Sequence, residues 1–228
     1  MDTKAQEAGS FFEKYGTALA VLVGALIIGG AFAFGQGGDR AEKTPEPVAV
    51  DIKDVKLDTS PFVGPKNAPV AVAVWFDYQC GFCKQFETTT MKEVMSSYGD
   101  KVRVVYKDFQ FLGPASNDAA IYSRAVWEAY PDRWHDWFSG MFEGGEESTL
   151  NQAAMDALST RLGLDIVRIN KLIADNRTDY QAAVDADREE GQTFGINGTP
   201  GTVIGTTLVS GAQPFENVKA LIDAELAK

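Results

Sequence analysis

The stretch PVAVAVWFDYQCGFC, residues 69–83, joins an uninterrupted apolar run to the only two cysteines of the 228-residue chain. The run Pro69–Phe76 is short, rich in valine and apolar at every position rather than at alternate positions. This pattern is typical of a parallel strand that is covered on both faces. We therefore expect the segment to be a central strand of an α/β sheet.

A helical pattern follows this strand and carries the cysteines. Apolar residues recur near helical spacing up to a stop at Gly99-Asp100, namely Phe82, Phe86, Met91, Val94, Met95 and Tyr98. Cys80 would then lie at a helix N-terminus, where unpaired N–H groups and the helix dipole favour a thiolate. Cys83 follows one turn later on the same face, within reach of a disulfide with Cys80. A spacing of three residues would arise by chance in roughly one chain in a hundred, so the pair indicates a redox site.

A second signal lies far downstream, in the stretch GINGTPGTVIG, residues 195–205. Here Pro200 introduces another expected strand. Because proline has no N–H, it leaves the preceding backbone free to pair with an extended substrate, and it can adopt the cis form.

The segments Phe76–Lys84 and Gly198–Pro200 together resemble the DsbA-like thioredoxin-fold disulfide oxidoreductases, with coverage from about Val63 to the C-terminus. The resemblance implies an α/β fold of the thioredoxin-like type with an inserted helical subdomain. It also implies a protein thiol–disulfide oxidoreductase that uses no cofactor and no metal besides its own redox-active disulfide.

The resemblance also assigns roles to individual residues. It implies that Cys80 is the nucleophile, that Cys83 resolves the mixed disulfide, and that Pro200 is cis and faces the disulfide. We expect the residues beside these three to contact the substrate, namely Thr199, Gly81 and Phe82.

The direction of electron flow stays open between oxidase, isomerase and reductase. The dipeptide Gly81-Phe82 differs from the Pro-His pair of strongly oxidising members and is nearer the Gly-Tyr pair of isomerase-type relatives. Val74 stands where thioredoxin-like proteins often carry a buried acid. We interpret Asp77 as a turn-forming residue at the exposed end of the strand.

Two other classes of protein are compatible with a Cys-x-x-Cys pair. One is a zinc module, although the chain has no second pair and His135 is its single histidine. The other is a peptide-binding or chaperone domain of the same fold that keeps an inert structural disulfide. His135 is also a candidate catalytic base, which we consider less favoured than a structural role.

The twenty residues 16–35 carry no charge and are enough to span a bilayer. We expect a single-pass anchor in the cytoplasmic membrane, although Ala31-Phe32-Ala33 resembles a signal-peptide cleavage site, after which the protein would be secreted. Flanking charges do not decide the orientation. Because disulfides persist outside the cytoplasm, we expect the catalytic domain on that side.

The remaining sequence divides by composition and pattern. The expected parts are a short N-terminal segment at 1–15, a tether at 36–61, a thioredoxin-like domain at 62–110 and 191–228, and an inserted helical subdomain at 111–190. Alternation at Val48, Val50 and Ile52 predicts a short edge strand within the tether. The predicted helices of the insert are Asn117–Tyr130, Arg133–Phe142, Leu150–Leu162, Asp165–Ala174 and Arg177–Glu190, with Ser116, Ser148 and Asp165 as N-caps. The insert also holds an aromatic cluster for which core packing is favoured over a peptide groove, namely Tyr122, Trp127, Tyr130, Trp134, Trp137, Phe138 and Phe142.

The net charge of −11 argues against nucleic acid or an anionic membrane surface as the partner. The expected partners are cysteine-containing protein substrates. From the resemblance we also expect a quinone-coupled membrane redox partner of DsbB or VKOR type. We expect the chain to be a monomer.

Overall fold

The computed structural model describes residues 50–143 and 150–228. The expected N-terminal segment, the anchor at 16–35, the possible cleavage site at 31–33, the first part of the tether and the predicted cap Ser148 lie outside these residues. No helix in the described ranges is long and apolar enough to cross a membrane.

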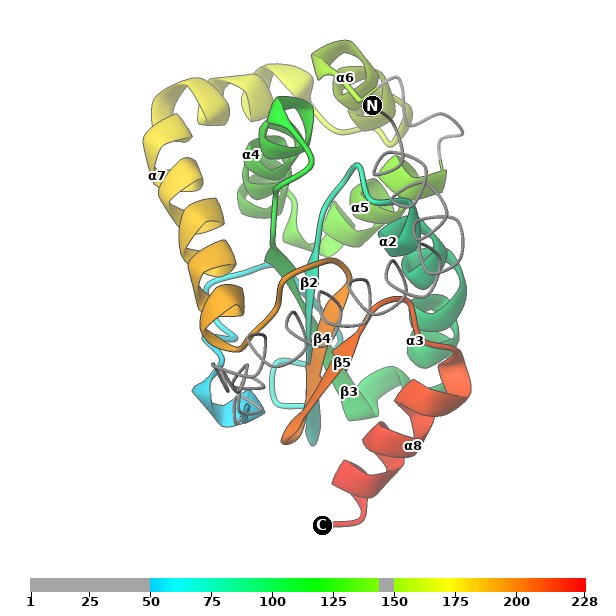
Figure 1. Cartoon of the computed structure of the whole chain (residues 1–228). Coiled ribbons are helices and arrows are strands. Elements are labelled where there is room, and N and C mark those ends of the chain that lie inside the picture. The colour runs from blue at the N-terminus through cyan, green and yellow to red at the C-terminus, as the bar shows by residue number, and fades with distance from the viewer. Residues whose placement is uncertain (1–49, 144–149) are drawn as a thin grey trace, which may run out of the picture. The chain divides into compact units, whose positions relative to one another are not determined.

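Five strands form one mixed sheet in the order β1-β3-β2-β4-β5 (Figure 1). The central strand β2 pairs in parallel with β3 and antiparallel with β4, and β1 and β5 form the edges. The bounds are Phe62–Val63 for β1, Val70–Phe76 for β2, Val102–Asp108 for β3, Gly201–Ile204 for β4 and Thr207–Ser210 for β5. The predicted central strand is thus confirmed, whereas the two-residue strand β1 was not predicted.

The apolar run of β2 is continuous because its two faces contribute to two different cores. Val72, Val74 and Phe76 belong to the larger core, and Ala73 and Trp75 belong to a smaller core on the opposite face. Each of these five residues is at most 3% exposed. Burial on both faces removes the alternation that a half-exposed strand would show.

The predicted helix between β2 and β3 is present but is not a regular α-helix throughout. It consists of α2 (Gly81–Phe86), a π-helical segment (Glu87–Met91) and α3 (Lys92–Tyr98). The hydroxyls of Thr88 and Thr89 donate to the carbonyl oxygens of Lys84 and Gln85, both at 2.7 Å. Such side-chain bonds compete with the regular backbone ladder, and short π segments occur frequently at functional sites.

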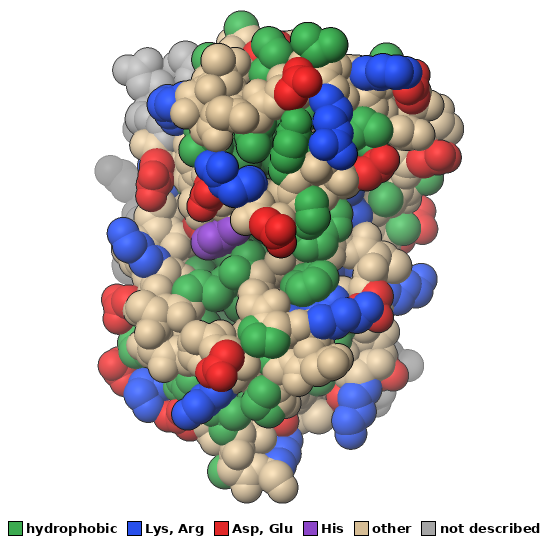
Figure 2. All heavy atoms as spheres, turned by 180° about the vertical axis from the view of Figure 1, so that it is seen from behind, with side chains coloured by type: hydrophobic (Ala, Val, Ile, Leu, Met, Phe, Trp, Pro, Cys, Tyr) green, Lys and Arg blue, Asp and Glu red, His purple; other side chains and the backbone are tan. Residues whose placement is uncertain are grey.

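The helical character of the predicted insert is confirmed, with changes in the number and limits of its helices. They are α4 (Pro114–Ala129), α5 (Trp134–Glu143), α6 (Gln152–Arg161) and α7 (Ile166–Thr193), and α8 (Phe215–Leu226) ends the chain. Figure 1 shows α3 and α8 on one side of the sheet and α7 on the other. The face seen from behind in Figure 2 carries acidic and basic side chains interspersed with apolar ones.

Two predictions within the insert are wrong. The two helices expected at 165–174 and 177–190 are the single helix α7. No glycine or proline interrupts the pattern between them. In addition, the ion pair Lys171–Asp175, at 2.6 Å, links residues one helical turn apart at the end of the first predicted helix. Ser116 does not cap α4, which begins at Pro114. It is fully buried in the first turn of that helix. The predicted cap Asp165 is confirmed, since its carboxylate accepts from the amides of Val167 and Arg168.

The described part of the expected tether, residues 50–61, is packed onto the domain. Val50 and Val55 are buried in the smaller core, and the Ile52 amide donates to the Gly205 carbonyl oxygen at 2.8 Å. Ile52–Asp54 forms a 3-10 turn rather than the predicted edge strand. The reason is that the two valines cover the apolar face around Trp75, which the composition of the segment did not reveal.

Candidate active site

Cys80 is the N-cap of α2, so the start of the helix points its free N–H groups at the sulfur. The Cys83 amide donates to the Cys80 Sγ at 3.3 Å, and the Cys80 amide donates to the Asp77 carbonyl oxygen at 3.1 Å. Both cysteines are free thiols in this structure, with 8% of Cys80 and 3% of Cys83 exposed. The expected helix N-terminus at Cys80 is therefore confirmed.

The environments of the two thiols push their pKa values in opposite directions. A hydrogen bond from the Cys83 side chain has the largest effect on Cys80 and outweighs burial, which acts the other way. With smaller contributions from the Thr199 side chain and the backbone of α2, the pKa of Cys80 falls to about 6. Burial raises the pKa of Cys83 far above its usual range. At neutral pH the pair therefore holds one thiolate, on Cys80, and one thiol, on Cys83.

The second predicted motif lies directly beside this pair. The Thr199–Pro200 peptide bond is cis, and the Cys80 thiol donates to the Thr199 carbonyl oxygen at 3.3 Å. Strand β4 begins at the next residue, Gly201, which pairs with Trp75 of the central strand. The pairing of β2 with β4 thus brings the two motifs together across the sheet.

Asp77 connects the cysteine loop to the loop that follows β3. Its carboxylate accepts from the amides of Gln79 at 2.8 Å, Phe111 at 2.9 Å and Leu112 at 3.1 Å, and from the Ser116 hydroxyl. The interpretation of Asp77 as a turn-forming residue agrees with the Gln79 contact. Its expected exposure is wrong, because Asp77 is fully buried by the loop from β3.

The loop after β3 is a part of the site that the sequence analysis missed. Phe111 and Leu112 are 47% and 45% exposed, and Phe82, between the cysteines, is 67% exposed. These are three of the four exposed large apolar residues in the described ranges. The signal available in the sequence was an apolar pair directly before Gly113-Pro114, a combination that indicates a loop. Of the other expected substrate contacts, Gly81 is exposed and Thr199 is half-buried.

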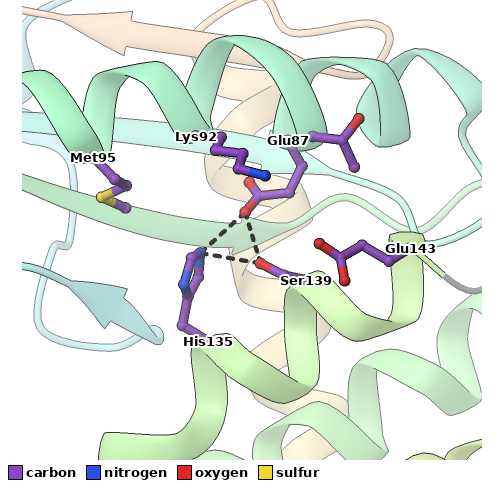
Figure 3. Close-up of a pocket in the computed structure, with 7 residues that line it drawn as sticks. Glu87, Lys92, Met95, His135, Ser139 and Glu143 are labelled. Carbon is purple, nitrogen blue, oxygen red and sulfur yellow. Dashed lines mark hydrogen bonds and ion pairs between the residues drawn. The ribbon is translucent and has the colours of Figure 1, made fainter.

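His135 lies in a separate pocket of about 190 Å³ between the π-helical segment and α5. Its Nε2 is 3.0 Å from Glu87 Oε1 and 3.3 Å from Ser139 Oγ (Figure 3). Because one nitrogen makes both contacts, these residues do not form a relay in which a histidine links a serine to an acid through its two nitrogens. The Tyr106 hydroxyl also donates to Glu87, at 3.1 Å.

The aromatic cluster of the insert forms core rather than a groove. Its most buried members are at most 3% exposed and belong to the larger core, namely Tyr122, Trp134, Trp137, Phe138 and Phe142.

Comparisons with known proteins agree with this architecture. A family model described as "Thioredoxin" matches residues 56–224. The chain is 25% identical to the disulfide bond formation protein D of Bacillus subtilis over 171 residues, which cover 73% of this chain and 77% of that protein. It is 23% identical to a probable disulfide bond formation protein D of Bacillus cereus over 213 residues, 90% of this chain and 94% of the other.

Two solved structures are similar over most of their length. The thiol-disulfide exchange protein alpha-DsbA2 of Wolbachia pipientis superposes with a TM-score of 0.68 at 25% identity, covering 73% of this chain and 87% of that one. Oxidised BdbD of Bacillus subtilis superposes with a TM-score of 0.71 at 21% identity, covering 80% and 99%.

Proposed function

The chain belongs to the thioredoxin family as a DsbA-like thiol–disulfide oxidoreductase, and from this premise we propose that Cys80 and Cys83 are the redox pair with which it oxidises cysteine-containing proteins outside the cytoplasm. The observation that carries the proposal is the separation of the two pKa values. The pKa of Cys80 is lowered to about 6, whereas that of Cys83 is raised.

This separation gives each sulfur its own step in the reaction. A substrate thiolate attacks Cys80 Sγ of the disulfide, and Cys83 leaves and takes up a proton. A second substrate thiolate then attacks the substrate sulfur of the mixed disulfide, and Cys80 leaves as a thiolate. The substrate loses two electrons and gains a disulfide, while the protein gains the two electrons as a dithiol.

The same geometry favours oxidation of substrates over their reduction. A low pKa makes Cys80 a good leaving group and stabilises the reduced protein, and a stabilised reduced form is what makes a disulfide strongly oxidising. Turnover then needs a partner that withdraws the two electrons. We assign this role to a membrane redox partner of DsbB or VKOR type, with residues 16–35 as the anchor that keeps the domain beside it.

A redox titration of the purified protein against glutathione, read by thiol trapping, tests the proposal. We expect a potential nearer to about −120 mV, the value of DsbA, than to about −270 mV, the value of thioredoxin. In parallel, oxidation of a reduced unfolded protein should stop in both Cys80→Ser and Cys83→Ala, because neither variant can form the Cys80–Cys83 disulfide, whereas Cys83→Ala mixed with a disulfide-bonded substrate should accumulate mixed disulfides at Cys80. Equal activity of Cys80→Ser and the wild type would contradict the assignment.

A further inference from the structure

We propose that the open hollow beside the Thr199 loop binds an acidic side chain of the protein substrate, with Arg188 as the residue that selects it. This inference rests on the proposed function and names a class of substrate for it.

The hollow has a volume of about 520 Å³ and lies between the end of α7, the loop after β3 and the loop before Thr199. The residues that matter here are Phe109, Phe111, Arg188, Gln192, Ile196 and Asn197. Two of its walls are attached to the redox site. The Phe111 amide is held by the Asp77 carboxylate at 2.9 Å, and Asn197 precedes Thr199 by two residues. The hollow therefore keeps a fixed position relative to Cys80.

The hollow is connected to the redox pair through a few residues of the loop before Pro200. Because the Thr199 carbonyl oxygen is 3.3 Å from Cys80 Sγ, a substrate cysteine that reacts with Cys80 must lie beside Thr199. An extended chain advances about 3.3 Å per residue. Because Asn197 is two residues before Thr199, its Cα lies within about 7 Å of that of Thr199, so a side chain two to four positions from the reacting cysteine can reach the hollow.

The walls combine apolar side chains with two amides, those of Gln192 and Asn197, and one cation. The rings of Phe109 and Phe111 pack edge to face with centroids 5.9 Å apart, and Phe111 is half exposed. The Arg188 guanidinium makes one long contact, from Nη1 to the Gln110 carbonyl oxygen at 3.4 Å. Within residues 50–143 and 150–228, no carboxylate lies within ion-pair distance of Arg188.

Two other cations of the domain differ from Arg188 in having carboxylate partners. Lys107 and Arg124 are almost fully buried, and each is paired with two carboxylates. A guanidinium has five N–H donors in a planar fork that matches a carboxylate, so Arg188 retains donors for one from outside. Because the chain as a whole carries a net charge of −11 and repels acidic chains at long range, a preference for acid must come from this local cation.

The occupant we infer is therefore an extended, unfolded segment with an acidic side chain a few residues from its cysteine. Phe82, Phe111 and Leu112 offer exposed apolar surface for the side chains around it.

Three dithiol peptides that differ in one residue three positions from the reacting cysteine, with aspartate, alanine or lysine there, test this inference. For the oxidised full-length protein we expect kcat/KM to be about tenfold higher for the aspartate than for the lysine peptide, and the ratio to shrink in high salt. Arg188→Glu should reverse the order. Arg161→Glu, the same charge change at an exposed residue of α6, should leave it unchanged.

The exchange rate with glutathione distinguishes a failure of the role of Arg188 from a failure of the proposed redox function. It should be the same in the wild type and Arg161→Glu. Intact glutathione exchange without discrimination among the peptides, or equal effects of the two substitutions, would overturn the role of Arg188 alone. Failure of the wild type to exchange with glutathione would instead overturn the proposed function.

Discussion

The sulfur of Cys80 lies 3.3 Å from the carbonyl oxygen of Thr199, although 119 positions separate the two residues. The neutral thiol donates its hydrogen to this oxygen. A thiolate has no hydrogen to donate, so ionisation of Cys80 leaves the oxygen free to accept from a backbone N–H of a substrate. Protonation of Cys80 thus has two effects. It makes the sulfur unreactive, and it engages the Thr199 carbonyl oxygen, to which an extended substrate would donate a backbone N–H.

The reduction potential should depend on pH with two slopes. Because the pKa of Cys80 is lowered to about 6 and that of Cys83 is raised, the reduced pair holds two protons below about pH 6 and one above it, while the disulfide holds none. We expect the potential to fall by about 59 mV per pH unit below pH 6 and by about 30 mV above it. Glutathione titrations between about pH 5 and pH 8 measure both slopes; a single slope over this range would contradict the lowered pKa of Cys80.

The same pKa predicts how the stability of the reduced protein changes with pH. A thiol whose pKa is lowered on folding, here from 9.0 to about 6, contributes stability that is complete above pH 9 and is lost as the pH falls through 6. The free energy of unfolding of the reduced wild type, compared with that of reduced Cys80→Ser, should therefore rise between pH 6 and 9. A difference that stays constant over this interval would show that Cys80 titrates normally.

Replacement of Asp77 should destabilise the fold around the redox loop. In Asp77→Asn one acceptor oxygen replaces two, and an amide NH2 faces buried donors, so we expect a loss of roughly 2–4 kcal/mol. Ser116→Ala is the matched control, because it removes only one of the four donors and should lose about 1 kcal/mol. Urea unfolding of the reduced proteins measures both losses. Equal losses would mean that the hydrogen bonds from the amides of Phe111 and Leu112 to the Asp77 carboxylate do not contribute to stability.

The features that the sequence predicted have local signals. The apolar run of β2, the helical spacing after Cys80 and the cap Asp165 each lie within one segment, so a single window of sequence shows them. The cis form of Pro200 and its place beside the cysteines came instead from the resemblance to a family.

The features that the sequence did not predict depend on partners far along the chain. Asp77 is buried because Phe111 and Leu112, 34 and 35 positions away, bond to it. Residues 50–61 pack because their two valines meet the face of the sheet around Trp75, although their composition is that of a linker. The continuity of α7 escaped prediction because the polar segment around Asn176 looks like a break.

Removal of the histidine should leave catalysis intact. A general base contributes about 100-fold or more to a rate, whereas His135 contacts Glu87, Ser139 and Tyr106 rather than a cysteine. We therefore expect His135→Ala to change the rate of oxidation of a dithiol peptide by less than about twofold. A loss near 100-fold, with unchanged thermal stability, would place His135 in the reaction.

Loss of the buried Lys107 in β3 should be the most damaging of these changes to stability. Lys107 is 1% exposed and pairs with Asp187 at 2.5 Å and Glu190 at 2.8 Å, themselves 4% and 8% exposed. Lys107→Met keeps the apolar stem but removes the cation that pairs with Glu190 and one of the two cations that pair with Asp187, the other being Arg124, so we expect a loss of about 3–5 kcal/mol near neutral pH.

Lys171→Met is the control for this substitution, because the pair Lys171–Asp175 is 73% and 53% exposed and should contribute less than about 1 kcal/mol. Urea unfolding at neutral pH compares the two variants. If Lys107→Met were no less stable than Lys171→Met, the buried pairs would not be what holds α7 against β3. The position of the loop that leads from α7 to Thr199 would then need another explanation, such as the packing of Gly191 against the ring of Trp75.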